Sequence, residues 1–196
     1  MILALDPSRV MGWAAAEPGG PLEFGHHVLA KRGSRPGQVG MELAKWLPDL
    51  IATTYPRLIV YEQPFTSPNF QTDFVLKGIG FTIDTIAETL RIDYYSVLAL
   101  EATKALTGRA KFPGKDYTER RKAKKLATVE ACRARGWDAT EDEADAIAIL
   151  LLAESKRFPE AALSRPRVLK VPKGPLFEEL FEKAREVRPK PRMIVT

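Results

Sequence analysis

Four acidic residues occupy positions where the surrounding pattern favours apolar side chains. Two of them each close a short apolar run ahead of a loop that contains proline, and the other two lie three residues apart at the start of an apolar helical pattern. Strand ends are rigid, and a spacing of three places two carboxylates on one face of a helix. The four residues are Asp6, Glu62, Asp142 and Asp145.

Asp145 is the most unusual of these acids, because Ile149 and Leu152 continue its helical face toward the core. An isolated charge there would be costly. Hard divalent cations such as Mg²⁺ or Mn²⁺ favour carboxylate oxygens and would remove that cost. Four convergent acids can hold two ions roughly 3.5 to 4 Å apart, which activates water and stabilises the leaving oxygen in phosphodiester hydrolysis. The pattern therefore predicts two Mg²⁺ or Mn²⁺ ions held by all four acids.

Each acid taken alone also has a structural explanation. An aspartate before proline, as at Asp6, is common turn chemistry, and Glu62 could be a solvated edge residue. Thr140 and Glu143 have the spacing of a capping box, and acids in a first helical turn favour the helix dipole, which accounts for Asp142. Asp145 lies past the cap and has no such explanation. The set of four is stronger evidence than any member.

Composition indicates a globular protein with a polyanionic partner. The chain has 196 residues, 45% of them hydrophobic, with a formal net charge of +5. This length suits one well-formed core. A single cysteine, Cys132, excludes an intramolecular disulfide, and the N-terminus lacks the order of a signal peptide, so we expect a cytoplasmic, intracellular protein. No apolar segment approaches the roughly 20 residues that span a bilayer, so no membrane partner is expected.

The order of the predicted elements is typical of a mixed-sheet α/β fold. An antiparallel meander of three strands comes first, and helices then alternate with two further strands. The body is expected to span residues 1–157, and a basic, proline-containing extension to span residues 158–196. The predicted strands cover residues 2–6, 12–17, 22–31, 57–62 and 92–97, and the predicted helices cover 37–55, 70–90, 99–108, a segment ending at 135, and 140–156.

At these residues the sequence resembles the RuvC family of Holliday-junction resolvases, within the RNase H-like superfamily. The resemblance covers approximately residues 1–154. Ser8 stands where the family usually has glycine, which alters the turn without removing a ligand. The matching pieces are "ILALDPSRVMGWA", "LIVYEQPF", "FVLKGIGFTIDTIAETL", "EATKALTGRA" and "EDEADAIAILLLAE".

The resemblance implies an RNase H-like mixed central sheet flanked by helices. It also implies a metal-dependent crossover junction endodeoxyribonuclease that works as a homodimer and nicks opposed strands of a four-way DNA junction. Carried over by position, the four acids are the catalytic metal ligands and Lys104 is a catalytic basic residue near the scissile phosphate. Phe65 would stack on an unpaired base, the alternative being a core-facing loop aromatic. The helix over residues 70–90 would pack against the partner subunit, the alternative being that its apolar stripe is ordinary core.

Basic residues dominate the segment that precedes the last helix of the body. Such a cluster favours binding to DNA phosphates, although most charge runs are simply a solvated helix face. The segment is longer and more basic than in the family, and the chain continues for about 40 residues past the last catalytic helix. Both departures resemble the phage-encoded branch, with a nucleoid or an infected cell as the setting. The predicted DNA contacts are Phe65, Lys104, Arg109, Lys111, Lys115, Arg120, Arg121, Lys122, Lys124 and Lys125.

Three other readings remain open at this stage. One is a non-catalytic junction-binding or assembly protein, and a second is an RNase H-like nuclease that acts on RNA or flaps. A sugar-kinase or actin-like ATPase half shares the opening strand and aspartate but needs phosphate-binding glycine loops, which "PSRVMG" does not supply. His26 and His27 are adjacent in a predicted strand and are left outside the site, and Cys132 has no neighbouring histidine motif that would make it a nucleophile.

Overall fold

A five-stranded mixed sheet in the order β3-β2-β1-β4-β5 forms the centre of the computed structural model, which describes residues 1–31, 33–64 and 69–164. The first three strands pair antiparallel as a meander, and the last two run parallel to β1. The mixed-sheet α/β class predicted from the sequence is therefore confirmed. The strands are β1 (Ile2–Asp6), β2 (Val10–Ala16), β3 (Glu23–Val28), β4 (Leu58–Glu62) and β5 (Asp93–Val97).

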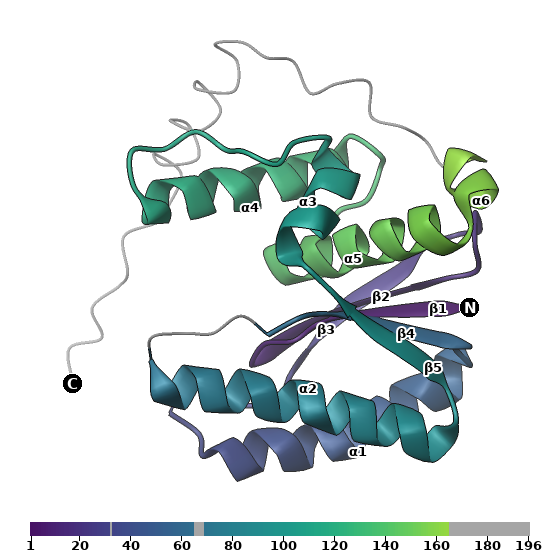
Figure 1. Ribbon diagram of the computed structural model, residues 1–196, viewed down its shortest axis with the longest axis vertical. Helices are drawn as coiled ribbons and strands as arrows, with labels where there is room; N and C mark the ends of the chain where they lie inside the picture. Colours follow the sequence, from purple (N-terminus) through teal and green to yellow (C-terminus); the bar gives the residue numbers. More distant parts are fainter. Residues whose placement is uncertain (32, 65–68, 165–196) are drawn as a thin grey trace.

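Helices cover both faces of the sheet (Figure 1). One layer holds α1 (Pro36–Thr54) and α2 (Phe70–Leu90), and the other holds α3 (Ala99–Thr107), α4 (Tyr117–Arg133), α5 (Glu141–Arg157) and α6 (Pro159–Ser164). In this view α4 extends beyond the end of the sheet where β1 and β4 finish. The carboxyl ends of these two strands therefore lie beside a helix.

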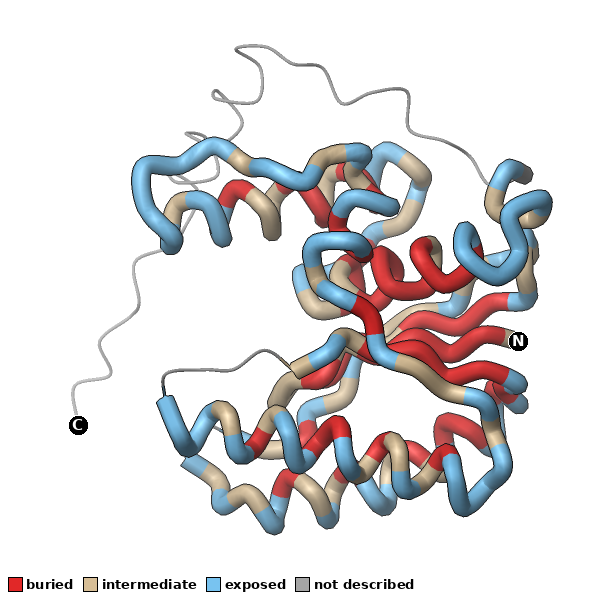
Figure 2. The backbone as a smooth tube through the Cα atoms, in the orientation of Figure 1, coloured by how far each residue is buried: buried red, intermediate tan, exposed pale blue. Residues whose placement is uncertain are grey.

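The two faces of β1 bury different residues. Ile2 and Ala4 pack into the core under α5, while Leu3 and Leu5 pack into the core under α1 and α2. Burial on both faces explains why the strand reads as a continuous apolar run (Figure 2). Side chains alternate along a strand, so Asp6 shares the face of Ile2 and Ala4. The strand therefore delivers its only charge to the α5 side.

The start of α5 is fixed by the capping box predicted from the sequence. The Thr140 hydroxyl oxygen accepts from the backbone N–H of Glu143, and the Glu143 carboxylate accepts from the backbone N–H of Thr140 at 2.7 Å. Beyond this cap the helix is almost entirely buried. Small residues such as Ala144 and Ala148 let it lie close to the sheet. The cap and the packing together set the height of the first turn above the strands.

The predicted elements are present, with shifts at their ends. The strand after the first turn begins at Val10 rather than residue 12, because the Ser8 hydroxyl bonds with the backbone N–H of Val10 at 3.1 Å and closes the turn early. The third strand ends at Val28, three residues before the apolar pattern does. The helix over residues 70–90 has the predicted bounds.

The predicted C-terminal extension is described only at its start. Its six residues Pro159–Ser164 form α6, which follows shortly after α5, and residues 165–196 lie outside the described part of the chain. In the part that the structure describes, no helix is long and apolar enough to cross a membrane.

Candidate functional site

One row of laterally neighbouring residues crosses the sheet near the carboxyl ends of β1 and β4. Its members are Glu62, Asp6, Gly12 and His26. Leu5 pairs with Tyr61, so the residues that follow them, Asp6 and Glu62, end neighbouring parallel strands side by side. On the other side Asp6 pairs with Gly12, and Gly12 pairs with His26. Laterally paired residues point to the same face of a sheet. The row therefore presents two carboxylates and an imidazole toward α5.

Helix α5 brings the other two acids onto this row. A Cβ atom added to Gly12 would collide with the carbonyl oxygen of Asp142, so the missing side chain is what lets the first turn of α5 touch β2. Asp145 follows one turn later, with a side chain only 13% exposed. The other three acids, one from β4 and two from α5, all act on Asp6 electrostatically. The structure thus brings together the four acids that the sequence singled out.

The surroundings disfavour the charged form of each of the four acids. Burial, followed by repulsion from Asp145, Glu62 and Asp142, raises the pKa of Asp6 well above its ordinary value. Burial likewise raises the pKa values of Glu62, Asp142 and Asp145. The four acids therefore carry more negative charge than their surroundings compensate. A bound cation would relieve this repulsion.

Two lysines of α4 supply part of the missing positive charge. The Lys124 Nζ lies 3.7 Å from Oδ1 of Asp145, and its charge lowers the pKa of Asp6, Glu62 and Asp145 against the effect of burial. The Lys125 Nζ lies 2.8 Å from a carboxylate oxygen of Glu141 and lowers the pKa of Asp142. Helix α4 is therefore joined to the acids by charge.

His26 belongs to the site, although the sequence analysis left it out. Its Nδ1 lies 2.8 Å from Oε1 of Glu143, the residue that also caps α5. Burial raises the pKa of Glu143, but the hydrogen bonds from Thr140 and His26 outweigh it, so the pKa lies below its ordinary value. The pair ties β3 to the first turn of α5. The other histidine, His27, faces the opposite side and contacts Glu42 at 3.1 Å.

The side chains of the four acids suit a hard divalent cation. Four carboxyl groups, desolvated and mutually repulsive, are the donors that Mg²⁺ and Mn²⁺ prefer. Within the described residues, however, no three histidine, cysteine or acidic side chains are already placed so as to hold a metal ion. The four acids thus match a divalent cation in the chemistry of their oxygen donors and in their shared location at one end of the sheet.

The predicted basic residues fall into two groups. Lys124 and Lys125 reach the acids, whereas Lys104 is exposed on α3. Phe65 lies outside the described residues. Arg109 is half-buried at the end of α3 and its backbone N–H donates to Thr107. The others are exposed on α4 or on the loop before it, namely Lys111, Lys115, Arg120, Arg121 and Lys122.

Sequence reasoning did not separate Lys124 from its neighbours, nor did it find the role of Gly12. One signal was present for the lysine. Thr128, which is fully buried, lies one turn after Lys124, so both share the inward face of α4. For Gly12 the only signal was a glycine inside a strand, which often marks a close approach of another backbone. No local pattern could identify the segment that approaches.

The fold resembles that of solved Holliday junction resolvases. Thermus thermophilus RuvC in complex with a Holliday junction substrate superposes with a TM-score of 0.57 at 13% identity, over 80% of this chain and 94% of that one. A second Thermus thermophilus RuvC structure gives 0.57 at 16% identity, over 81% and 96%. The yeast mitochondrial Holliday junction resolvase Ydc2 gives 0.49 at 10% identity, over 83% and 82%.

At the level of sequence, no family model and no curated protein matches the chain. The structural likeness establishes the class of fold. The protein has a RuvC-like, RNase H-like fold, as the motifs predicted.

Proposed function

We propose that this protein is a metal-dependent, structure-selective endodeoxyribonuclease that resolves Holliday junctions and other branched DNA by paired phosphodiester hydrolysis. One observation carries the proposal: Asp6, Glu62, Asp142 and Asp145 converge at one end of the sheet beside Lys124. The RuvC-like fold supports it, because one of the solved structures of that fold is a complex with a Holliday junction substrate.

The four carboxylates would hold the divalent ions in this proposal. Two Mg²⁺ or Mn²⁺ ions held there would supply a nucleophilic water at neutral pH and would stabilise charge on the departing oxygen. Lys124 contributes an ammonium group beside Asp145, where it steadies the negative charge that develops on the phosphate. His26 holds Glu143 and so keeps the first turn of α5, with Asp142, against the strands. Lys104 remains a predicted catalytic residue.

The DNA would lie along α4 and the loop before it. The exposed basic side chains of this segment, among them Arg120, Arg121 and Lys122, are positioned for phosphates, and Lys124 continues the same helix to the acids. A DNA backbone bound along α4 would therefore have a phosphate close to the carboxylates. Phe65, Lys104, Arg109, Lys111 and Lys115 complete the predicted contact set.

A homodimer is part of the proposal, with α2 as its contact. Phe74 and Phe81 are exposed on this helix at 55% and 74%, and Gly78 lies between them. Apart from its own turn of helix, no atom of the described residues lies within 4 Å of a Cβ placed there. Aromatic side chains around a glycine suit close packing of a second helix. Two active sites would then face opposed strands of one junction. Membership of the phage-encoded branch, and an intracellular location, are further elements of the proposal.

The test compares cleavage of labelled four-way junction, flap, linear duplex and RNA–DNA hybrid substrates, with Mg²⁺ or Mn²⁺ and with chelator. Asp145→Asn removes one of the four acids, and Asp93→Asn is the matched control, because Asp93 is exposed at the start of β5, away from the strand ends that carry Asp6 and Glu62. We expect paired, symmetric junction nicks that need metal, vanish in Asp145→Asn and persist in Asp93→Asn.

Other outcomes would select among the alternatives. Cleavage of flaps or of the RNA strand without junction resolution would favour an RNase H-like nuclease of different substrate class. Tight junction binding with no cleavage under either metal would overturn the enzymatic proposal and favour a junction-binding or assembly protein. Cleavage that survives in Asp145→Asn would show that the cluster of four acids is not the active site.

A further inference from the structure

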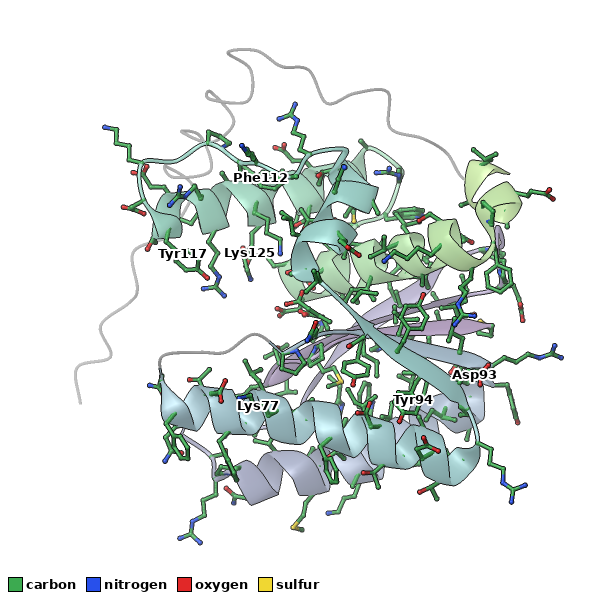
Figure 3. The ribbon with its side chains drawn as sticks, viewed as in Figure 1. Lys77, Asp93, Tyr94, Phe112, Tyr117 and Lys125 are labelled. Atoms are coloured by element: carbon green, nitrogen blue, oxygen red, sulfur yellow. The ribbon has the colours of Figure 1, made fainter. Side chains whose placement is uncertain are left out.

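Tyr117, the first residue of α4, is a large aromatic side chain without a place in the core. Its exposed fraction is 68%, and it heads a helix whose following turn carries Arg120 and Arg121. Figure 3 shows the ring on the side of α4 toward which Lys125 also points. An exposed aromatic ring set among cations is typical of surfaces that bind single-stranded nucleic acid.

The helical phase of Tyr117 turns it toward the site. Lys124 follows seven residues later and Thr128 eleven residues later, and either separation returns to within about 20° of the same direction on an α-helix. Lys124 contacts Asp145 and Thr128 is fully buried, so this direction faces the body of the protein. Tyr117 keeps its exposure because α4 reaches past the end of the sheet (Figure 1).

The first turn of α4 is held in place by the loop before it. Oδ1 of Asp116 accepts from the backbone N–H of Glu119 at 2.9 Å, and the Glu119 carboxylate accepts from the backbone N–H of Lys115 at 2.8 Å. Gly114 lies so close to the backbone N of Arg120 that a Cβ atom there would stand 2.5 Å away. These contacts fix the Tyr117 backbone before any ligand arrives, which lowers the entropic cost of binding.

The distance to the acids fits a short length of DNA. Seven residues of α-helix advance about 10.5 Å, so Tyr117 lies roughly that far along α4 from Lys124. Nucleotides of one strand are spaced about 3.4 Å apart in a duplex. The ring is therefore about three nucleotides from a phosphate held beside Lys124, and Arg121, one turn after Tyr117, stands between them.

From this geometry, and resting on the proposed function, we propose that Tyr117 is a stacking platform for an unpaired DNA base about three nucleotides from the phosphate that is cut. The favoured ligand is thus a strand whose base pairing is interrupted near the cleavage position, as it is at a branch point. Arg121 neutralises the intervening backbone. The recognition is sequence-tolerant, because every base presents a π-face.

The test measures binding of a four-way junction to the Asp145→Asn protein, which leaves the DNA uncut, with 2-aminopurine placed singly at successive positions near the branch. Variants Tyr117→Ala, Tyr117→Phe and Tyr117→Leu are added to this background. The matched control is Tyr55→Ala, because Tyr55 is 79% exposed and follows α1 at the opposite end of the sheet, next to the start of β4.

We expect Tyr117→Ala to weaken binding roughly 5- to 150-fold, the range that corresponds to the loss of one base–aromatic stack. Tyr117→Phe should bind like the parent, Tyr117→Leu should fall short of it, and Tyr55→Ala should have no effect. Quenching of 2-aminopurine should be confined to one or two positions and be lost in Tyr117→Ala. The slope of log K against log salt should not change, whereas Arg121→Ala should reduce it by about 0.9.

Two results would overturn this inference while the proposed function stands: junction binding unchanged in Tyr117→Ala, or Tyr117→Phe as weak as Tyr117→Ala, which would assign the effect to the hydroxyl. A failure of the unsubstituted chain to bind any branched DNA would overturn both proposals together.

Discussion

The ammonium nitrogen of Lys124 lies 3.7 Å from a carboxylate oxygen of Asp145, with the two side chains 26% and 13% exposed. The contact joins two helices, and the positive charge also acts on Asp6 and Glu62. Lys124 is therefore a built-in counter-charge to three of the four acids, and Lys125 is a second one beside Asp142 and Asp145. Because these positive charges offset only part of the effect of burial and of mutual repulsion, the pKa values of these acids remain raised.

Replacing Lys124 by methionine should both destabilise the protein in chelator and slow cleavage. The partly buried pair is intermediate between exposed and buried ion pairs, so we expect a loss of roughly 1 to 3 kcal/mol in the free energy of unfolding. Loss of a group that stabilises developing charge should lower kcat about 100- to 1,000-fold. Denaturant titration and single-turnover cleavage measure the two effects.

The control for Lys124→Met is Lys122→Met, an exposed lysine of the same helix. It should leave stability within about 0.5 kcal/mol of the parent, as for most surface changes. Adding Asp145→Asn to Lys124→Met should produce clear non-additivity, because the two side chains interact directly. Additive losses in that double-mutant cycle would contradict the interaction.

Replacing Asp6 by asparagine should stabilise the metal-free protein at neutral pH. The native state holds the Asp6 proton more tightly than the unfolded chain does, so the wild-type stability from this group is complete below about pH 4 and is lost as pH rises through the raised pKa. Asparagine has no charge to lose. The difference in unfolding free energy between the two proteins, measured in chelator from pH 4 to 8, should grow with pH.

Magnesium should reverse this order if the acids hold a cation. Saturating Mg²⁺ should stabilise the wild type more than Asp6→Asn, because binding to the native state alone adds to its stability. If the difference in unfolding free energy between the two proteins shrinks as pH rises in chelator, the surroundings do not raise the pKa of Asp6.

Replacing Gly12 by alanine should displace the first turn of α5 and lower activity. A Cβ atom there collides with the backbone of Asp142, which cannot move alone because the helix is capped and packed. Overpacking of this kind costs roughly 1 to 3 kcal/mol. Gly40→Ala is the control, because outside its own turn of helix no atom of the described part of the chain lies within 4 Å of its added Cβ, and alanine favours its helix. Thermal unfolding and junction cleavage should fall in the first variant only.

The thiol of Cys132 should be inert in the native protein. It is fully buried, and burial raises its pKa to about 12, so very little thiolate exists at pH 8. A chromogenic disulfide reagent should react only as fast as the protein opens, and reaction should be complete within seconds in concentrated guanidinium. Rapid labelling of the native protein would contradict the packing of α4 on α5.

Replacing Phe81 by glutamate should produce a monomer if α2 is the dimer contact. Phe81 is 74% exposed, so the change should not alter the unfolding of an isolated subunit. Sedimentation velocity at several concentrations should then show a dimer for the parent and a monomer for the variant, with paired nicking reduced to single nicks. Met41→Glu is the matched control, because Met41 is 61% exposed on α1. A parent that stays monomeric would rule out the dimer.

Much of the fold was predictable because its signals are local. Continuous apolar runs marked β1 and β4, and the three- and four-residue spacing of apolar side chains marked α2 with its observed bounds. The cap of α5 was readable from Thr140 and Glu143. The four acids stood out because each interrupts such a pattern. The sequence by itself therefore determined the elements, the α/β class and the candidate carboxylates.

Only the tertiary structure decided which residues meet. Strand register placed Gly12 and His26 in one row with Asp6, and register depends on pairing between distant segments. Among neighbouring lysines of α4, the packing of Thr128 and the approach of α5 selected Lys124 for the acids. A sequence pattern repeats within a few residues, whereas a site is made by elements far apart in the chain. Its geometry is therefore set by the packing of the whole fold.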